Sequence, residues 1–249
     1  ITANSASSYG GGAYLGKLHG CVITGNSARE GGGVYVSAVD NCVISSNVVS
    51  GYGGGAYGGS LTNCIVYFNT GGNNHGLSTL LYCCTTPLPD GAGNFTNNPA
   101  FVNPSAGNFR LQFNSPCINS GNNAYVNSAT DLDGVPRILN GTVDIGAYEW
   151  FPHHVSLSST NPLPPYLSWS SAATNIQDAI DVAIAGDMIL VSNGVYRSGV
   201  RSVNGITANR VALDKAVTVR SANDLMPWYL YLMGPDSQAT RGQIVECQT

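Results

Sequence analysis

The chain has 249 residues, of which 43% are hydrophobic and 10% are charged, so it can bury one long or two short hydrophobic cores. Its formal net charge of −4 and its scattered basic residues argue against nucleic acid as a partner, because proteins that bind nucleic acid cluster Lys and Arg. No run approaches about 18 consecutive apolar residues, so the sequence predicts no membrane span.

Residues 1 to 69 repeat, and three separate patterns keep the same phase. One asparagine closes each repeat, in steps of 22, 21 and 22 residues: Asn4, Asn26, Asn47 and Asn69. A cysteine precedes three of these asparagines by five residues: Cys21, Cys42 and Cys64. A Gly-Gly-Gly-X-Tyr motif ends at the same place in three repeats: Tyr14, Tyr35 and Tyr57. A repeat this short cannot bury its own apolar face, so the period predicts a solenoid of stacked coils.

The composition of the repeats selects strands over helices. Gly clusters together with Asn, Ser, Val and Ile predict short strands joined by tight turns. Stacked parallel coils lie about 4.8 Å apart, so equivalent residues form columns. We expect the four asparagines to form a structural ladder in which each amide donates to the carbonyl of the next. An unpaired buried amide costs about 1–3 kcal/mol, so the ladder satisfies itself only when the coils are stacked.

The tyrosines of the repeat are the candidate binding residues. Alternation in each motif places small or aliphatic residues on one face of the strand and the tyrosine on the other. If that second face is solvent-exposed, Tyr14, Tyr35 and Tyr57 form a candidate carbohydrate-binding column, because aromatic rings can stack on sugars. The alternative is a structural aromatic stack that stiffens the sheet. The Cys-Val-Ile segments are apolar at both parities, so periodicity does not decide which way the cysteines point.

These motifs resemble those of the right-handed parallel β-helix family, in particular long surface and secreted bacterial proteins. Polymorphic outer-membrane proteins and autotransporter passengers carry related patterns. The resemblance implies an all-β, right-handed parallel β-helix and a secreted or cell-surface location. It describes a scaffold, on which function has to be argued separately.

The repeat decays between residues 70 and 150. The motifs that follow it run Asn98-Pro-Ala-Phe101, Ser115-Pro-Cys-Ile118, Asp131-Leu-Asp-Gly-Val-Pro-Arg137 and Asp144-Ile-Gly-Ala-Tyr-Glu149. Their order resembles the C-terminal end of many β-helix proteins, where such a segment is a terminal cap. Residues 1–150 are therefore expected to be the last coils and cap of a β-helix. We expect no cofactor; Asp131 and Asp133 leave calcium open, but the favoured alternative pairs these carboxylates with Arg137 and backbone N–H groups.

The cysteines predict buried thiols and one cross-link. The repeating cysteines are expected to be small buried hydrophobes, with Cys83 or Cys84 at the end of their column. A disulfide between Cys84 and Cys117 is the candidate pairing, and it would imply an oxidising compartment. No metal site is expected, because the sequence has neither a CxxC motif nor a histidine pair at ligand spacing.

A second domain is expected after a linker. Residues 151–170 are rich in proline and predict a semi-rigid linker. Beyond it, Thr174-Asn-Ile-Gln177 is a capping-box pattern that opens a short amphipathic helix near residues 174–185. Residues 171–249 resemble the N-terminal cap helix and first coils of a pectate-lyase-type β-helix. The chain is then expected to be part of a longer multidomain protein, and one continuous solenoid is the alternative.

The sequence favours a non-catalytic module. Glycoside hydrolases need paired acids and lyases need calcium-binding carboxylates with a base, whereas residues 1–69 have few charged residues and no charged column: Lys17, Arg29, Glu30 and Asp40. We therefore expect a module for adhesion, carbohydrate binding or use as a rigid stalk, with a polysaccharide or cell-surface glycan as the partner. The alternative is a fragment of a polysaccharide lyase or glycoside hydrolase with the β-helix fold.

Overall fold

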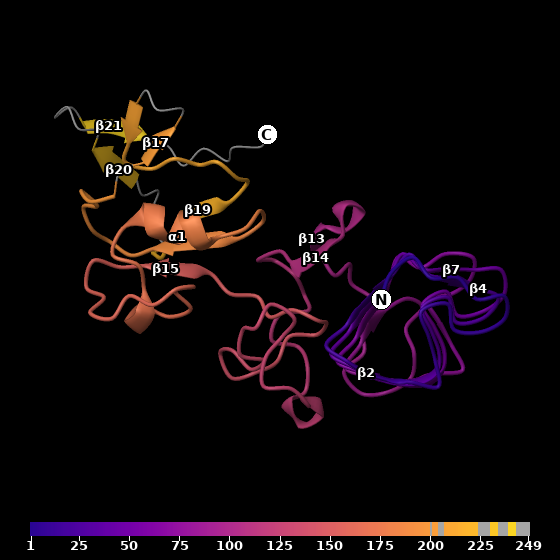
Figure 1. Cartoon of the computed structure of the whole chain (residues 1–249). Helices are drawn as coiled ribbons and strands as arrows, with labels where there is room; N and C mark the ends of the chain where they lie inside the picture. The colour runs from indigo at the N-terminus through magenta and orange to yellow at the C-terminus, as the bar shows by residue number, and fades with distance from the viewer. Residues whose placement is uncertain (200, 204–206, 224–229, 234–238, 243–249) are drawn as a thin grey trace. The chain divides into compact units, whose positions relative to one another are not determined.

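The computed structural model describes residues 1–199, 201–203, 207–223, 230–233 and 239–242. The chain divides into two compact units, Ile1–Trp150 and Phe151–Thr249. Unit 1 is a parallel β-solenoid, and Figure 1 shows its coils stacked one on another at the N-terminal end of the chain.

Two parallel sheets form the solenoid. The first has six strands, in the order β1-β5-β8-β10, with β2 also pairing with β5 and β11 with β8: Ala13–Tyr14, Val34–Asp40, Ala56–Thr62, His75–Gly76, Lys17–His19 and Thr79–Leu81. The second has the order β3-β6-β9-β12: Val22–Thr24, Val43–Ser45, Ile65–Tyr67 and Cys84–Thr85. A third, short pair joins β4 and β7, Ser27–Ala28 and Val48–Val49.

The strand register follows the sequence repeat. Tyr35 is the partner of Tyr14 in one direction and of Tyr57 in the other, and all of these pairs are parallel. The prediction of a β-solenoid with one short α-helix is therefore confirmed for the part of the chain that the structure describes.

The solenoid core explains the Gly triplets and the doubly apolar segments. Ile23, Ile44 and Val66 point inward beside the thiols of Cys42 and Cys64. Each such buried aliphatic side chain contributes about 1.5–3 kcal/mol. The glycines allow neighbouring coils to approach closely: a Cβ on Gly33 would lie 2.5 Å from the carbonyl oxygen of Gly55.

Residues 95–150 pack along the outward side of the second sheet. Val43 and Ile65 on that side form a hydrophobic cluster with Phe101, Phe109 and Ile145. This segment has few regular elements: β13 (Phe101–Asn103) and β14 (Asn108–Leu111) are antiparallel, with short 3-10 helices at Pro104–Ala106 and Asn123–Tyr125. The expected terminal cap thus covers a side of the coils. It does so because the second sheet is apolar on both faces. For the same reason, the alternation within the Cys-Val-Ile segments did not indicate which residues point inward.

A buried arginine ties this segment to the coils. Arg137 donates from Nη2 to the Asn41 side chain and to the carbonyl oxygens of Asp144 and Gly146, and its Nη1 lies 3.3 Å from Glu149 Oε1. The guanidinium is almost fully buried. Removing either side chain would leave the polar group of the other without this partner in a dry site.

Unit 2 is built on the parallel sheet β15-β16-β19: His153–Val155, Met188–Val191 and Thr218–Ser221. Helix α1, Ile176–Val182, begins at Asn175, whose side chain accepts from the Asp178 N–H. The antiparallel pairs are β17 with β18, Arg201–Val203 and Thr207–Asn209, and β20 with β21, Leu230–Met233 and Ala239–Gly242. The described residues contain no helix with the length and apolarity to cross a membrane.

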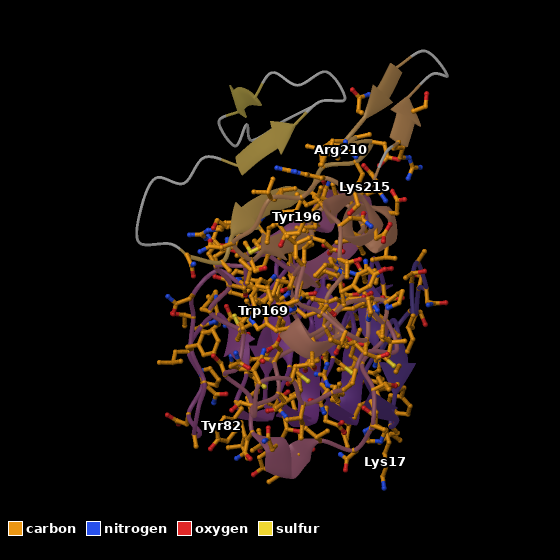
Figure 2. The ribbon with its side chains drawn as sticks, turned by 90° about the vertical axis from the view of Figure 1, so that its left-hand side faces the viewer. Lys17, Tyr82, Trp169, Tyr196, Arg210 and Lys215 are labelled. Atoms are coloured by element: carbon orange, nitrogen blue, oxygen red, sulfur yellow. The ribbon has the colours of Figure 1, made fainter. Side chains whose placement is uncertain are left out.

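Residues 151–170, expected as a linker, are folded into unit 2. They contain β15, which is buried and pairs with β16, and Tyr166, which packs against α1. The prolines misled the prediction because they flank β15: Pro152 directly precedes the strand, and the other three lie in the connection after it. Figure 2 labels two residues that close the unit: Tyr196 Oη donates to the Val155 carbonyl at 3.2 Å, and Lys215 Nζ donates to the Ala183 carbonyl, just past the C-terminal end of α1, at 2.9 Å.

Candidate functional site

The three predicted tyrosines form one stack on the outside of the first sheet. Tyr14, Tyr35 and Tyr57 belong to β1, β5 and β8, and their strand neighbours Val34 and Ala56 point inward. Ring centroids are 5.6 Å apart from Tyr14 to Tyr35 and 5.7 Å apart from Tyr35 to Tyr57, with interplanar angles of 20° and 18°. Tyr14 is 55% exposed.

The rings overlap only in part. Contacting ring planes lie about 3.5–4 Å apart, so a centroid separation of 5.6 Å requires a lateral offset of about 4 Å. The rings are therefore in an offset-stacked arrangement. Tyr14 at the end of the stack is exposed, whereas Tyr35 and Tyr57 are half-buried.

Two further tyrosines complete this surface, and sequence reasoning missed both. The Tyr9 ring lies 4.6 Å from that of Tyr35, and the Tyr52 ring lies 6.3 Å from that of Tyr57. We call the five residues the tyrosine face: Tyr9, Tyr14, Tyr35, Tyr52 and Tyr57. Tyr9 and Tyr52 lie outside the Gly-Gly-Gly-X-Tyr motif, but they lie 21 and 22 residues on either side of Glu30. That spacing was the available signal, and the glutamate at the middle position hid it.

Glu30 occupies the centre of the second column. It forms a parallel bridge with Tyr9, and the N–H of the following Gly31 donates to the Tyr52 carbonyl at 3.0 Å. Burial and then the Glu30 carboxylate raise the pKa of Tyr35, because the phenolate would form beside an existing negative charge. Among the described residues, none forms a hydrogen bond or ion pair with the Glu30 carboxylate.

An exposed aliphatic column borders the tyrosines. Leu15, Val36 and Leu77 each follow the tyrosine position of their coil, and we call them the aliphatic column. They are 62%, 41% and 82% exposed, and their φ angles are 53°, 46° and 48°. The left-handed region costs an L-residue about 1–2 kcal/mol, and a β-branched residue is rarely found there. Gly58 takes the equivalent position in the third coil and carries no such cost.

The stack ends at Gly76. Its strand partner is Tyr57, and a Cβ on Gly76 would lie 2.9 Å from the Tyr57 ring. The glycine therefore lets the last ring lie over the backbone of the next coil. A larger residue at this position would push the Tyr57 ring away from its place.

The asparagine column is continuous beneath this surface. Asn26 donates from Nδ2 to Asn47 Oδ1 at 2.9 Å, and Asn47 donates in the same way to Asn69 at 2.9 Å. Asn4 donates to Asn26 at 3.0 Å at the exposed end. Asn74 extends the column, since it accepts from Asn69 at 2.9 Å. The column is one chain of hydrogen bonds that holds the coils of the tyrosine face in register.

The cysteine column points inward. Cys42, Cys64 and Cys83 are fully buried, and burial raises the pKa of the first two. Cys84 points to the other side of its strand, where a hydrogen bond with the Cys117 side chain, then burial, raises its pKa. Both are free thiols in the structure, so the expected disulfide stays a prediction.

The acidic residues of the 95–150 segment are occupied by the protein's own donors. Asp131 accepts from the N–H groups of Asp133, Val135 and Glu149, while Asp133 pairs with Arg110 at 2.6 Å. The backbone N–H contacts are those of the favoured alternative to calcium, but its Arg137 partner is wrong, because Arg137 pairs with Glu149 and Asp133 pairs with Arg110. In the part of the chain that the structure describes, no three His, Cys, Asp or Glu side chains are placed to share a metal ion.

The buried acids Asp144 and Glu149 are held near Arg137. Asp144 accepts from the N–H groups of Asn119 and Trp150, at 2.7 and 2.6 Å. Burial raises the pKa of Asp144 to about 6 and that of Glu149 to about 8, against the attraction of Arg137.

Unlike Glu30, three other polar residues of the coils lie farther along their coils than the tyrosines: Lys17, His19 and Asp40. Asp40 of β5 hydrogen-bonds with His19 of β2, a partner that the sequence did not suggest, and with Asn41 at 3.0 Å. Lys17 lies two residues before His19 on β2, and in Figure 2 its side chain points away from the ribbon. A histidine and one carboxylate are not the pair of acids that glycoside hydrolysis needs.

Comparison of the chain with models of protein families, with curated proteins and with solved structures finds no match in any of the three.

Proposed function

We propose that unit 1 is a non-catalytic module that binds a polysaccharide or cell-surface glycan through the tyrosine face. The supporting observation is the patch itself, in which three exposed tyrosines, two half-buried ones and the exposed aliphatic column occupy one side of three to four coils. A solitary exposed apolar residue needs no explanation, but a continuous exposed patch usually marks a binding surface. Adhesion to a glycan-covered surface is the biological role that follows.

Two features make this patch costly to keep for any other purpose. Val36 and Leu15 are exposed and hold left-handed backbone angles, although glycine at the same column position avoids the cost, as Gly58 does. Covering these exposed side chains with a ligand would add a hydrophobic gain of about 25 cal/mol for each Å² of apolar surface buried. The partly uncovered ring faces of Tyr14 and Tyr35 would meet the C–H face of a sugar, while the phenol hydroxyls would bond to its hydroxyl groups.

The rest of unit 1 serves as a rigid support. The asparagine ladder and the Arg137 contacts fix the coils, so that little order has to be gained on binding. We place the protein among the right-handed parallel β-helix proteins of bacterial surfaces, with residues 95–150 as its family-type cap, on the strength of its repeat motifs. Unit 2 is proposed as the beginning of a second, pectate-lyase-like β-helix. A secreted or cell-surface location follows from this placement.

A glycan array tests the proposal directly. The full chain, a Tyr35→Ala variant and a Phe113→Ala variant would be compared, because Phe113 is an exposed aromatic residue outside the tyrosine face. The wild type and Phe113→Ala should bind the same glycans, and Tyr35→Ala should lose at least about 1–2 kcal/mol, or roughly tenfold in affinity. Equal binding by Tyr35→Ala and wild type, or no binding by either, would remove the tyrosine face from consideration and leave a rigid stalk as the function.

A further inference from the structure

The charge at the centre of the tyrosine face carries a more specific inference, which rests on the proposed function. Glu30 lies between Tyr9 and Tyr52 in its column and close enough to Tyr35 to act on its ionisation. Arg29 precedes Glu30 and is exposed, but these two described residues form no ion pair with each other. The carboxylate is thus available to a ligand that lies on the rings.

Such a surface has a preferred ligand charge. An aromatic ring attracts a cation placed over its face, and a carboxylate that is partly shielded from water strengthens a charge-assisted hydrogen bond. Acting together on one group, the rings and Glu30 favour an ammonium. A sugar acid would instead bring a second negative charge next to Glu30, while a neutral sugar would leave the carboxylate without a cationic partner.

We propose that the tyrosine face recognises glycans with free amino groups, in which a protonated amine sits against Glu30 while the sugar ring lies on Tyr35 and its neighbours. The ligand class is therefore oligomers of hexosamines that are not acetylated. Acetylation of the amine removes both the positive charge and two of its three N–H donors. Oligomers of uronic acids are disfavoured by repulsion.

Binding of defined oligomers by calorimetry tests this selectivity. The ligands are glucosamine oligomers, N-acetylglucosamine oligomers and galacturonic acid oligomers of one length, and the proteins are wild type, Glu30→Gln and Asp90→Asn. Asp90→Asn makes the same charge change at an exposed acid in the loop after β12. We expect wild type and Asp90→Asn to prefer the glucosamine oligomer, and Glu30→Gln to lose about fivefold in affinity for it at low salt, with a smaller loss at high salt.

The outcomes separate the two proposals. If the acetylated and free-amine oligomers bind equally, and Tyr35→Ala weakens both, the tyrosine face binds glycans but the role given to Glu30 is wrong. The same conclusion follows if Glu30→Gln and Asp90→Asn behave alike. If a lysine oligomer of equal charge binds as tightly as the glucosamine oligomer, charge alone is responsible and the inference about sugars fails. If the wild type binds none of the oligomers, both proposals fail.

Discussion

The strongest test of the solenoid is to remove one interior amide of the asparagine ladder. The Asn47 side chain is fully buried and donates from Nδ2 to Asn69 Oδ1, to the Ile23 carbonyl and to the Ser45 carbonyl, at 2.9, 2.9 and 3.2 Å. Its Oδ1 accepts from the backbone N–H and from Nδ2 of Asn26, both at 2.9 Å. Asn47→Ala deletes these bonds and leaves their partners buried without replacements.

The expected cost follows from these contacts. With about 1 kcal/mol for each lost bond, and more where a buried group stays unsatisfied, Asn47→Ala should destabilise the coils by about 3–5 kcal/mol. Asn4→Ala should cost less than about 1 kcal/mol, because Asn4 is exposed and water replaces its partners. Asn47→Asp keeps the size but replaces the Nδ2 donor with a carboxylate oxygen that faces three acceptors, so it should be at least as harmful as Asn47→Ala.

Hydrogen exchange measured by mass spectrometry follows this change locally. Backbone amides of residues 22–69 should exchange about 10²–10⁴ times faster in Asn47→Ala than in wild type, while unit 2 peptides stay unchanged. If Asn47→Ala and Asn4→Ala change exchange equally, or if neither changes it, the ladder does not hold the coils and the reasoning is wrong.

Three other predictions concern separate parts of unit 1. Burial raises the pKa of Glu149 to about 8, above the unfolded value of about 4, so the folded state holds a proton that the unfolded state releases. The contribution of Glu149 to the free energy of unfolding is therefore full below about pH 4 and is lost as pH rises through about 8. Limited proteolysis should show this loss as faster cleavage within residues 95–150 at rising pH. Gly33→Ala should lower the free energy of unfolding by about 1–3 kcal/mol in urea titrations, whereas Gly16→Ala, with open space around it, should be nearly neutral. Because a raised pKa slows attack by the thiolate, oxidised glutathione should join Cys84 and Cys117 in a disulfide only at alkaline pH; a peptide map with both still reduced there would contradict this.

The parts of the fold that the sequence predicts are those that repeat. A period of 21 or 22 residues fixes which side chains are stacked, so Asn26 over Asn47 and Tyr14 over Tyr35 follow from counting. Tyr9 and Tyr52 were missed because Glu30 interrupts their column, and a single different residue in three hides a pattern. The aromatic face was therefore predicted at its centre and not at its edges.

The parts that failed depend on contacts between residues distant in sequence. The inward direction of Cys42 could not be predicted, because Val43 on the opposite face is also buried, under residues 95–150. That packing has no periodic signal. The buried strand His153–Val155 was hidden for a similar reason: two histidines and nearby prolines are atypical of a central strand, and only its pairing with β16 makes it one.

The direction of the asparagine ladder has one further consequence. The side-chain amides of Asn26 and Asn47 each accept from the preceding coil and donate to the following one, so the junctions between these coils are chemically the same. Excision of one whole period, residues 27–47, would bring the amide of Asn26 against that of Asn69 with the same polarity. It would also remove Glu30, Tyr35 and Val36 together. The solenoid can therefore lengthen or shorten only by whole repeats of 21 or 22 residues. Each repeat that is added or removed also adds or removes part of the tyrosine face.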